Sequence, residues 1–166
     1  MKKSISGTIV LWVVLAISTC AFAQVAMGDK EVLRRLDRVH VTLERLQPEI
    51  ELDGLYGNIL LSDAEIRLKM AGIKVLSEEE CLETSNVASL SLRVNTLKRR
   101  FGYIYRVELF LVEPVELIRN KMRRDARILE IPGGWAMGSV SDIRKKASDT
   151  MDEFIRAWEE ANPKKE

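Results

Sequence analysis

LSLRVNTLKRRFGYIYRVELFL, residues 90–111, decides the fold. Apolar residues alternate with polar ones on both sides of a turn at Lys98 to Gly102. A period of two is typical of a β-strand with one buried face, so the stretch predicts two strands joined by a short turn. Further strands are predicted at 39–43, 73–76 and 127–131. Consecutive strands with short connections favour an antiparallel meander.

The clearest helix is amphipathic and lies near the C-terminus. Its apolar positions recur every three or four residues, on one helix face, at Ile143, Ala147, Met151, Phe154, Trp158 and Ala161. Ser139 or Ser141 can cap its start, and Asn162-Pro163 stops it. We expect this helix, about 20 residues long, to cover one face of the sheet with Phe154 and Trp158.

A second helix is predicted before Gly72. Ser62 and Glu65 fit a capping box, in which each side chain accepts a hydrogen bond from a backbone amide of the first turn. Gly72 suits the left-handed residue that closes a helix. The start of this helix stays open, because residues 56–61 can belong to it despite Gly57.

Two local motifs follow outside the long helices. Ser77 to Glu80 fits another capping box, which predicts a short helix that holds Cys81 and Leu82, with Cys81 buried beside its neighbour. Pro132-Gly133-Gly134 permits a kink, after which we expect the Trp135 ring to pack on the core.

Together these elements predict an α+β fold. We expect two layers, in which a mostly antiparallel sheet of about five strands is covered by two main helices. The predicted domain boundaries are a signal peptide at 1–23, a flexible N-terminal segment at 24–35, a single domain at 36–163 and a tail at 164–166.

The first residues have the layout of a secretory signal peptide. Lys2-Lys3 is followed by an apolar run from Ile9 to Ile17 and then by Ala21-Phe22-Ala23. A positive start, a short apolar centre and small residues before the cut predict cleavage between Ala23 and Gln24. We therefore expect export through the Sec route to the periplasm.

Two alternatives to cleavage at this position remain open. An uncleaved membrane anchor is disfavoured, because the apolar run is shorter than the roughly 20 residues that span a bilayer. A lipoprotein signal ending at Cys20 is disfavoured because Thr19 is bulkier than the small residue usual before such a cysteine.

Composition gives the exported chain no global attraction to polyanions. Loss of Lys2 and Lys3 leaves 24 basic residues against 25 acidic ones, a net charge of −1. Nucleic acid and membrane surfaces are therefore not favoured by net charge. Cleavage also removes Cys20, so that Cys81 would be a single thiol with no internal disulfide.

No constellation of catalytic, cofactor-binding or metal-ligating residues is found. His40 is the single histidine, whereas a histidine-based zinc site needs two or three. One histidine suffices for a Ser-His-acid triad, but no serine stands in a Gly-x-Ser-x-Gly frame. A thiolate pair of Cys81 with His40 is the remaining catalytic hypothesis. Gly133-Gly134 lacks the spacing of a phosphate loop, and Glu78 to Glu80 lacks that of a calcium loop. We predict no catalytic residue, cofactor or metal.

Two basic clusters flank one predicted strand. The first is Lys98-Arg99-Arg100, and the second comprises Arg119, Lys121, Arg123, Arg124 and Arg127. In a meander they lie at opposite ends of the sheet and cannot form one groove. Solvated hairpin tips are the favoured interpretation, and a contact with anionic lipid headgroups or acidic polymers is the alternative.

Two segments carry a family likeness. EIRLKMAGIKV at 65–75, and FIRAW at 154–158 with Asn162-Pro163-Lys164 after it, resemble small exported bacterial domains of unknown function. The order strand, helix, strands, helix is also similar to the amino-terminal domain of TolB and to CsgG-type envelope domains. The resemblance spans most of the chain after the leader, implies docking or assembly, and brings no catalytic residues. Gly57 departs from its usual helix pattern.

We therefore expect a non-enzymatic interaction or assembly module of the cell envelope, whose partner is another envelope protein and not nucleic acid. Such a module predicts an exposed sheet edge or apolar groove. A binder of a small amphiphile or lipid is the first alternative, and it predicts an enclosed apolar pocket between helix and sheet. An enzyme of unknown type is the second alternative.

Overall fold

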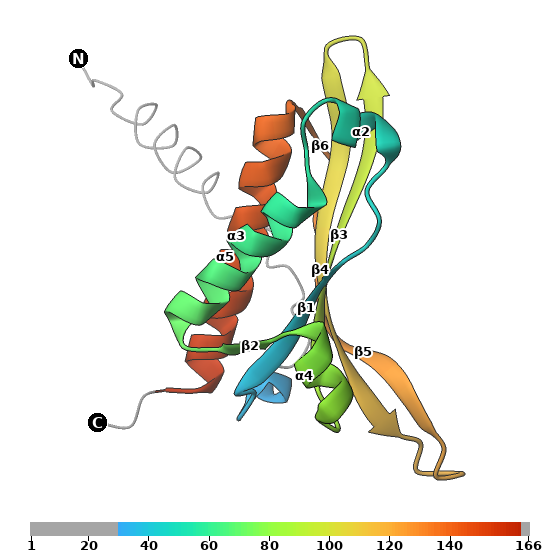
Figure 1. The fold of residues 1–166 in the computed structure, drawn as a ribbon, viewed down its shortest axis with the longest axis vertical. Helices are drawn as coiled ribbons and strands as arrows, with labels where there is room; N and C mark the ends of the chain where they lie inside the picture. Colours follow the sequence, from blue (N-terminus) through green and yellow to red (C-terminus); the bar gives the residue numbers. More distant parts are fainter. Residues whose placement is uncertain (1–29, 164–166) are drawn as a thin grey trace, which may run out of the picture.

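The computed structural model describes residues 30–163, which form a sheet with its two long helices on one face (Figure 1). The fold class is α+β, as predicted, with six strands in place of the expected five. In chain order the elements are η1 (Lys30–Leu33), β1 (Arg38–Leu43), α2 (Pro48–Leu52), α3 (Gly57–Ala71), β2 (Lys74–Leu76), α4 (Glu78–Glu83), β3 (Ala88–Arg99), β4 (Gly102–Glu116), β5 (Arg123–Ile131), β6 (Ala136–Gly138) and α5 (Val140–Ala161).

The sheet is mixed, with strand order β2-β1-β3-β4-β5 and with β6 also paired to β4. β3 and β4 form the long antiparallel hairpin that the alternating stretch predicts, in register from Ser89↔Val112 to Arg99↔Gly102. β1 departs from the expected meander, because it is parallel to both β2 and β3. The connection from β1 to β2 contains α3, which is long enough for the crossover that parallel strands require.

β4 shares its second edge between β5 and β6. The chain leaves β5 at Ile131, which pairs with Leu109, and returns as β6 at Ala136. Between the two strands Gly133 passes so close to β4 that a Cβ there would lie 1.8 Å from the Val107 carbonyl oxygen. Only glycine therefore permits the kink predicted at this position.

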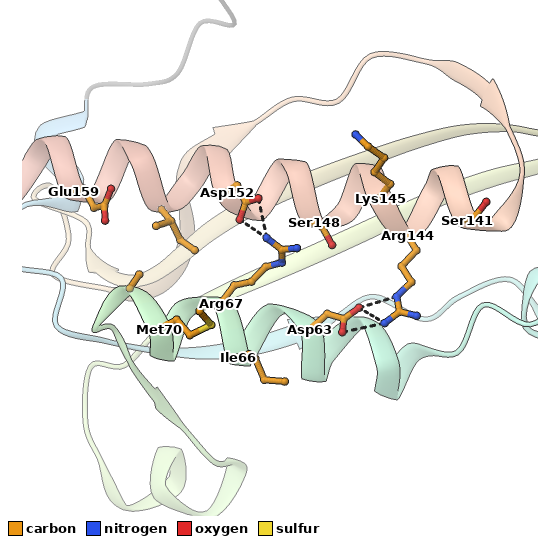
Figure 2. A pocket seen from close by; sticks show the side chains of 12 residues that line it. Asp63, Ile66, Arg67, Met70, Ser141, Arg144, Lys145, Ser148, Asp152 and Glu159 are labelled. Carbon is orange, nitrogen blue, oxygen red and sulfur yellow. Dashed lines mark hydrogen bonds and ion pairs between the residues drawn. The ribbon is translucent and has the colours of Figure 1, made fainter.

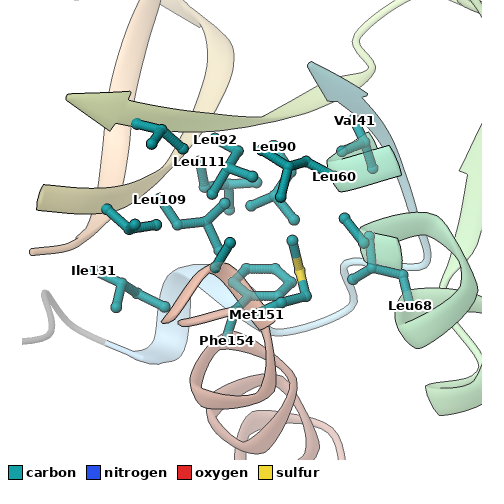
Figure 3. Close-up of a cluster of buried hydrophobic side chains, with 14 of the residues drawn as sticks. Val41, Leu60, Leu68, Leu90, Leu92, Leu109, Leu111, Ile131, Met151 and Phe154 are labelled. Carbon is teal, nitrogen blue, oxygen red and sulfur yellow. The ribbon is translucent and has the colours of Figure 1, made fainter. Parts of the chain in front are cut away.

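The core lies between the sheet and the α3–α5 layer (Figure 3). Phe154 and Met151 of α5 are buried opposite the inward-facing leucines of β3 and β4. Trp158 packs against this core, and its indole N–H donates to the Leu36 carbonyl at 2.6 Å. The amphipathic pattern of the C-terminal helix is thereby confirmed.

The caps of α5 and α4 follow the predicted motifs. Ser139, and not Ser141, caps α5, and it forms a reciprocal capping box with Asp142. Ser77 and Glu80 form the expected capping box of α4. A helix end without such partners would leave backbone amides unsatisfied.

α3 begins earlier than its predicted capping box. Its N-cap is Tyr56, so Ser62 lies inside the helix and the box with Glu65 does not form. A Cβ at Gly57 would lie 3.0 Å from the Leu43 side chain, so glycine lets the helix start close to β1. Gly72 ends the helix in the left-handed conformation, as predicted.

Three surface and boundary predictions are corrected. Trp135, the residue before β6, is 64% exposed and does not pack against the core. Leu82 is 86% exposed and Cys81 is half-buried, so the Cys81 thiol is not buried beside Leu82 as predicted. Leu33 of η1 is fully buried against α5, so residues 30–33 of the segment predicted to be flexible pack on the folded domain.

The predicted signal peptide, with its cleavage site between Ala23 and Gln24, lies outside the described residues, as does the tail at 164–166. No helix between Lys30 and Pro163 combines the length and apolar character needed to cross a membrane.

Candidate functional site

The sheet face opposite α3 and α5 carries charged side chains that are packed on an aromatic ring. Phe110 points to this face, yet it is only 1% exposed. The guanidinium carbons of Arg93 and Arg127 lie 4.7 Å and 4.1 Å from its ring centroid. Both guanidinium groups cover the ring, an arrangement that cation–π attraction stabilises.

A β-bulge brings Arg127 to this face. The register of β4 with β5 runs Leu111↔Leu129 and then Val112↔Arg127, so Ile128 is an extra residue. Side chains alternate along a strand, and one extra residue exchanges the two faces beyond it. Without the bulge, Arg127 would share the core face with Leu129.

Two of the arginines on this strip, Arg93 and Arg106, are neutralised by glutamates. Arg93 donates two hydrogen bonds to Glu44, at 2.7 and 2.6 Å. Glu108 is almost fully buried and accepts an ion pair from Arg106 at 2.6 Å and a hydrogen bond from Asn95 at 3.3 Å. Arg93 and Arg106 are thus balanced by Glu44 and Glu108, whereas Arg127 has no ion pair among residues 30–163.

The Arg93–Glu44 pair predicts a pH dependence of stability. The hydrogen bonds from Arg93 hold the pKa of the Glu44 carboxyl below its usual value. A lowered folded-state pKa stabilises the fold above the unfolded-state pKa, and this contribution is lost as pH falls through the folded-state value. Glu44→Gln is therefore expected to reduce the free energy of unfolding at about pH 7 and to have little effect near about pH 3.

Urea titrations of both proteins at the two pH values would measure this effect. Glu83→Gln, on the far end of α4, is the matched control, because Glu83 has no ion pair among residues 30–163. An equal effect of Glu44→Gln at both pH values would contradict the prediction.

A row of apolar side chains, three exposed and one half-buried, crosses the same face near the β3–β4 hairpin. Leu97, Ile104 and Met137 are consecutive register partners on β3, β4 and β6. Met137 is 71% exposed, and the exposed Trp135 lies two residues before it in the chain. We call Leu97, Ile104, Trp135 and Met137 the apolar row. Sequence periodicity does not reveal the apolar row, because β6 has only three residues, too few to show a period.

A groove of about 810 Å³ runs along the outside of the helix layer, between α3 and α5 (Figure 2). Two ion pairs cross it. Arg67 contacts both carboxylate oxygens of Asp152 at 2.6 and 2.8 Å, and Arg144 contacts those of Asp63 at 2.8 and 3.1 Å. These side chains bind the helices to each other, so their charges are already paired. The sequence could not predict the pairs, because their partners are more than 80 positions apart.

The cavity described between the helices and the sheet is small. It lies among Leu60, Leu92 and Met151 and has a volume of about 10 Å³. This is about the space of one water molecule. This cavity is therefore too small to hold the small amphiphile or lipid of the alternative hypothesis.

The structure does not arrange the predicted catalytic candidates as a site. His40 lies on β1 with its Nδ1 atom 3.1 Å from the Leu76 carbonyl oxygen. Burial, followed by the charges of Glu80 and Glu78, raises the pKa of the Cys81 thiol, which disfavours the reactive thiolate. Across residues 30–163, no group of three or more His, Cys, Asp or Glu side chains is placed to hold a metal ion.

The two basic clusters lie at opposite ends of the sheet, as expected. Lys98 to Arg100 is at the β3–β4 turn, whereas the second cluster occupies the β4–β5 hairpin (Figure 1). Within the first cluster Lys98 is neutralised by Asp53 at 2.6 Å. Tyr103 also donates to Asp53, which ties this turn to α2.

Comparison with known proteins yields similar folds only. No protein-family model and no curated protein sequence matches the chain. Among solved structures, the PelC dodecamer from Paraburkholderia phytofirmans is similar at a TM-score of 0.45 and 19% identity, over 79% of this chain and 91% of that chain. A variant PelC dodecamer in another crystal form gives 0.42 and 16%, over 75% and 90%. At these values neither activity nor assembly transfers to this chain, and the resemblance to TolB and CsgG-type domains stays a prediction.

Proposed function

We propose that this chain is a non-enzymatic interaction module of the cell envelope that docks another envelope protein through the apolar row. The observation that carries the proposal is the exposure of Met137 and Trp135 beside Leu97 and Ile104 on an uncovered sheet face. Large apolar side chains that gather on a surface are typical of protein–protein contacts.

The surroundings of the apolar row support docking at the face rather than at a sheet edge. In the adjoining strip around Phe110, Arg93 and Arg106 are held by ion pairs and Arg127 lies against the ring, so the strip presents a preorganised surface. The sheet edges are less suitable, because β2 has only three residues and β5 carries many charged side chains, which oppose strand addition.

The envelope location rests on the leader. Its positive start, short apolar centre and Ala21-Phe22-Ala23 motif support export and cleavage before Gln24. We infer that the folded domain then faces the periplasm, where an envelope partner is accessible.

Photo-crosslinking in cells would test this proposal. A photoreactive amino acid at Met137 is expected to give one discrete product in the envelope fraction. Leu97→Glu should reduce its yield about tenfold, because a buried leucine contributes about 1.5–3 kcal/mol to a contact.

The matched control places the probe at Leu82, which is equally apolar and exposed but lies on α4. The same products from both positions would refute docking at the apolar row. A chain recovered in the cytoplasmic fraction with its leader intact would refute export, independently of the crosslinking result.

A further inference from the structure

The β4–β5 hairpin extends beyond the rest of the sheet. β3 pairs with β4 only as far as Val112, whereas β4 and β5 remain paired to Glu116↔Arg123. Residues 113–126 therefore form a two-stranded ribbon, which projects away from α3 and α5 (Figure 1). Its tip can reach a flat surface without obstruction by the helix layer.

Apolar side chains are displayed at this tip. All residues from Glu116 to Asp125 are exposed, and Ile118 is 90% exposed. The loop is closed by hydrogen bonds from Leu117 N to Met122 O at 2.9 Å and from Lys121 N to Leu117 O at 2.8 Å. These hydrogen bonds fix the backbone in a form that holds Leu117, Ile118 and Met122 in solvent. Exposure of apolar side chains to water costs free energy, and burial of the three side chains in an apolar surface would remove that cost.

Unpaired arginines surround the apolar tip. Lys121 is paired with Glu116 at 3.3 Å. Arg119, Arg123 and Arg124 pair with no acidic side chain among residues 30–163. From Glu116 to Asp125 there are four basic and two acidic residues, a net charge of +2 on a short exposed ribbon.

We propose that the tip of the β4–β5 hairpin binds the surface of an anionic lipid bilayer. Ile118, with Leu117 and Met122, enters the boundary between headgroups and acyl chains, and the three arginines bind the lipid phosphates. The apolar tip distinguishes a bilayer from nucleic acid or an acidic polymer, which would engage the arginines but leave Ile118 in water. The β3–β4 turn is less suited, because Asp53 neutralises Lys98 there.

Vesicle co-sedimentation of the exported chain tests the proposal directly. Vesicles of phosphatidylcholine with phosphatidylglycerol are expected to bind the protein, and vesicles of phosphatidylcholine alone are not. Binding should weaken between about 0.1 M and about 1 M salt, where the screening length falls from about 10 Å to about 3 Å. Combined Arg119→Gln, Arg123→Gln and Arg124→Gln should weaken it on the order of 100-fold, because each arginine near the surface contributes about fivefold.

Three further variants make the test specific. Ile118→Ser should weaken binding roughly tenfold. Asp125→Asn should strengthen binding to the anionic vesicles about fivefold, with no gain of binding to vesicles of phosphatidylcholine alone. Combined Arg99→Gln and Arg100→Gln at the other hairpin is the matched control and should change binding by less than about twofold.

Equal binding to uncharged vesicles, or an equal loss in the Arg99–Arg100 control, would overturn the proposal. So would duplex DNA binding as tight as vesicle binding with Ile118→Ser neutral, since that pattern describes a general polyanion surface. The assay contains no partner protein, so its outcome is independent of docking at the apolar row.

Discussion

Gly133→Ala is expected to lower the free energy of unfolding by about 3 kcal/mol, the upper end of the usual cost of overpacking. The new Cβ would lie 1.8 Å from the carbonyl oxygen of Val107, and that obstacle is backbone of the central strand β4 and cannot rotate away. The segment between β5 and β6 would have to lift from the sheet. It would then lose the hydrogen bond that Arg106 Nε donates to the Gly133 carbonyl at 2.8 Å.

Gly134→Ala provides the control for this substitution at the next residue. A Cβ on Gly134 meets no atom within 4 Å. Both substitutions replace glycine by alanine, so both reduce the backbone entropy of the unfolded chain in the same way. We expect Gly134→Ala to change stability by less than about 1 kcal/mol. Urea unfolding followed by circular dichroism measures both, and equal midpoints for the two variants would contradict the close crossing at Val107.

Phe154→Ala is expected to cost about 3–5 kcal/mol, because it leaves a cavity at the centre of the helix–sheet interface. The ring is fully buried, and the leucines of β3 and β4 are held in the sheet and cannot move to fill the space. A loss of this size is a large share of the 5–15 kcal/mol that stabilises a typical domain. The variant should therefore unfold at a much lower temperature or fail to accumulate.

Met70→Ala is the matched control for the loss of a large apolar side chain. Met70 lies on the exposed side of α3, at the groove with α5. Its removal should shift the free energy of unfolding by no more than about 0.5 kcal/mol. Thermal unfolding followed by calorimetry compares the two proteins. Similar melting temperatures for Phe154→Ala and the native chain would show that α5 does not cover the sheet as described.

Sequence periodicity predicted the fold where one face of an element is buried and the other is wet. β3, β4 and α5 satisfy that condition, and their core positions were identified correctly. The pattern in β1 also showed which of its side chains are buried. Alternation identifies the buried face of a strand, but it does not identify the strands that pair with it. The parallel pairing of β1 with β2 and β3 therefore could not be predicted from Val39 and Val41 alone.

The candidate surfaces were less predictable, because they depend on contacts between distant segments. The Pro132-Gly133-Gly134 kink predicts Trp135 in the core, but the residue lies just before β6, outside the strand, and is exposed. The ion pairs of Arg67 and Arg144 across the α3–α5 groove depend on the relative placement of two helices. By contrast, the basic cluster of the β4–β5 hairpin was visible in the sequence, because its members are close along the chain.

The extra residue in β5 also has a consequence for how the gene can change. Loss of the single codon for Ile128 would restore an uninterrupted ladder in which Leu129 and Arg127 keep their partners Leu111 and Val112, so no side chain would exchange faces. A regular ladder that retained Ile128 would instead drive the guanidinium that now shields Phe110 into the apolar interior, where an unpaired charge is not tolerated. The deletions that this hairpin accepts should therefore fall at Ile128, or in the loop at Arg119 and Asn120, where no ladder fixes the register.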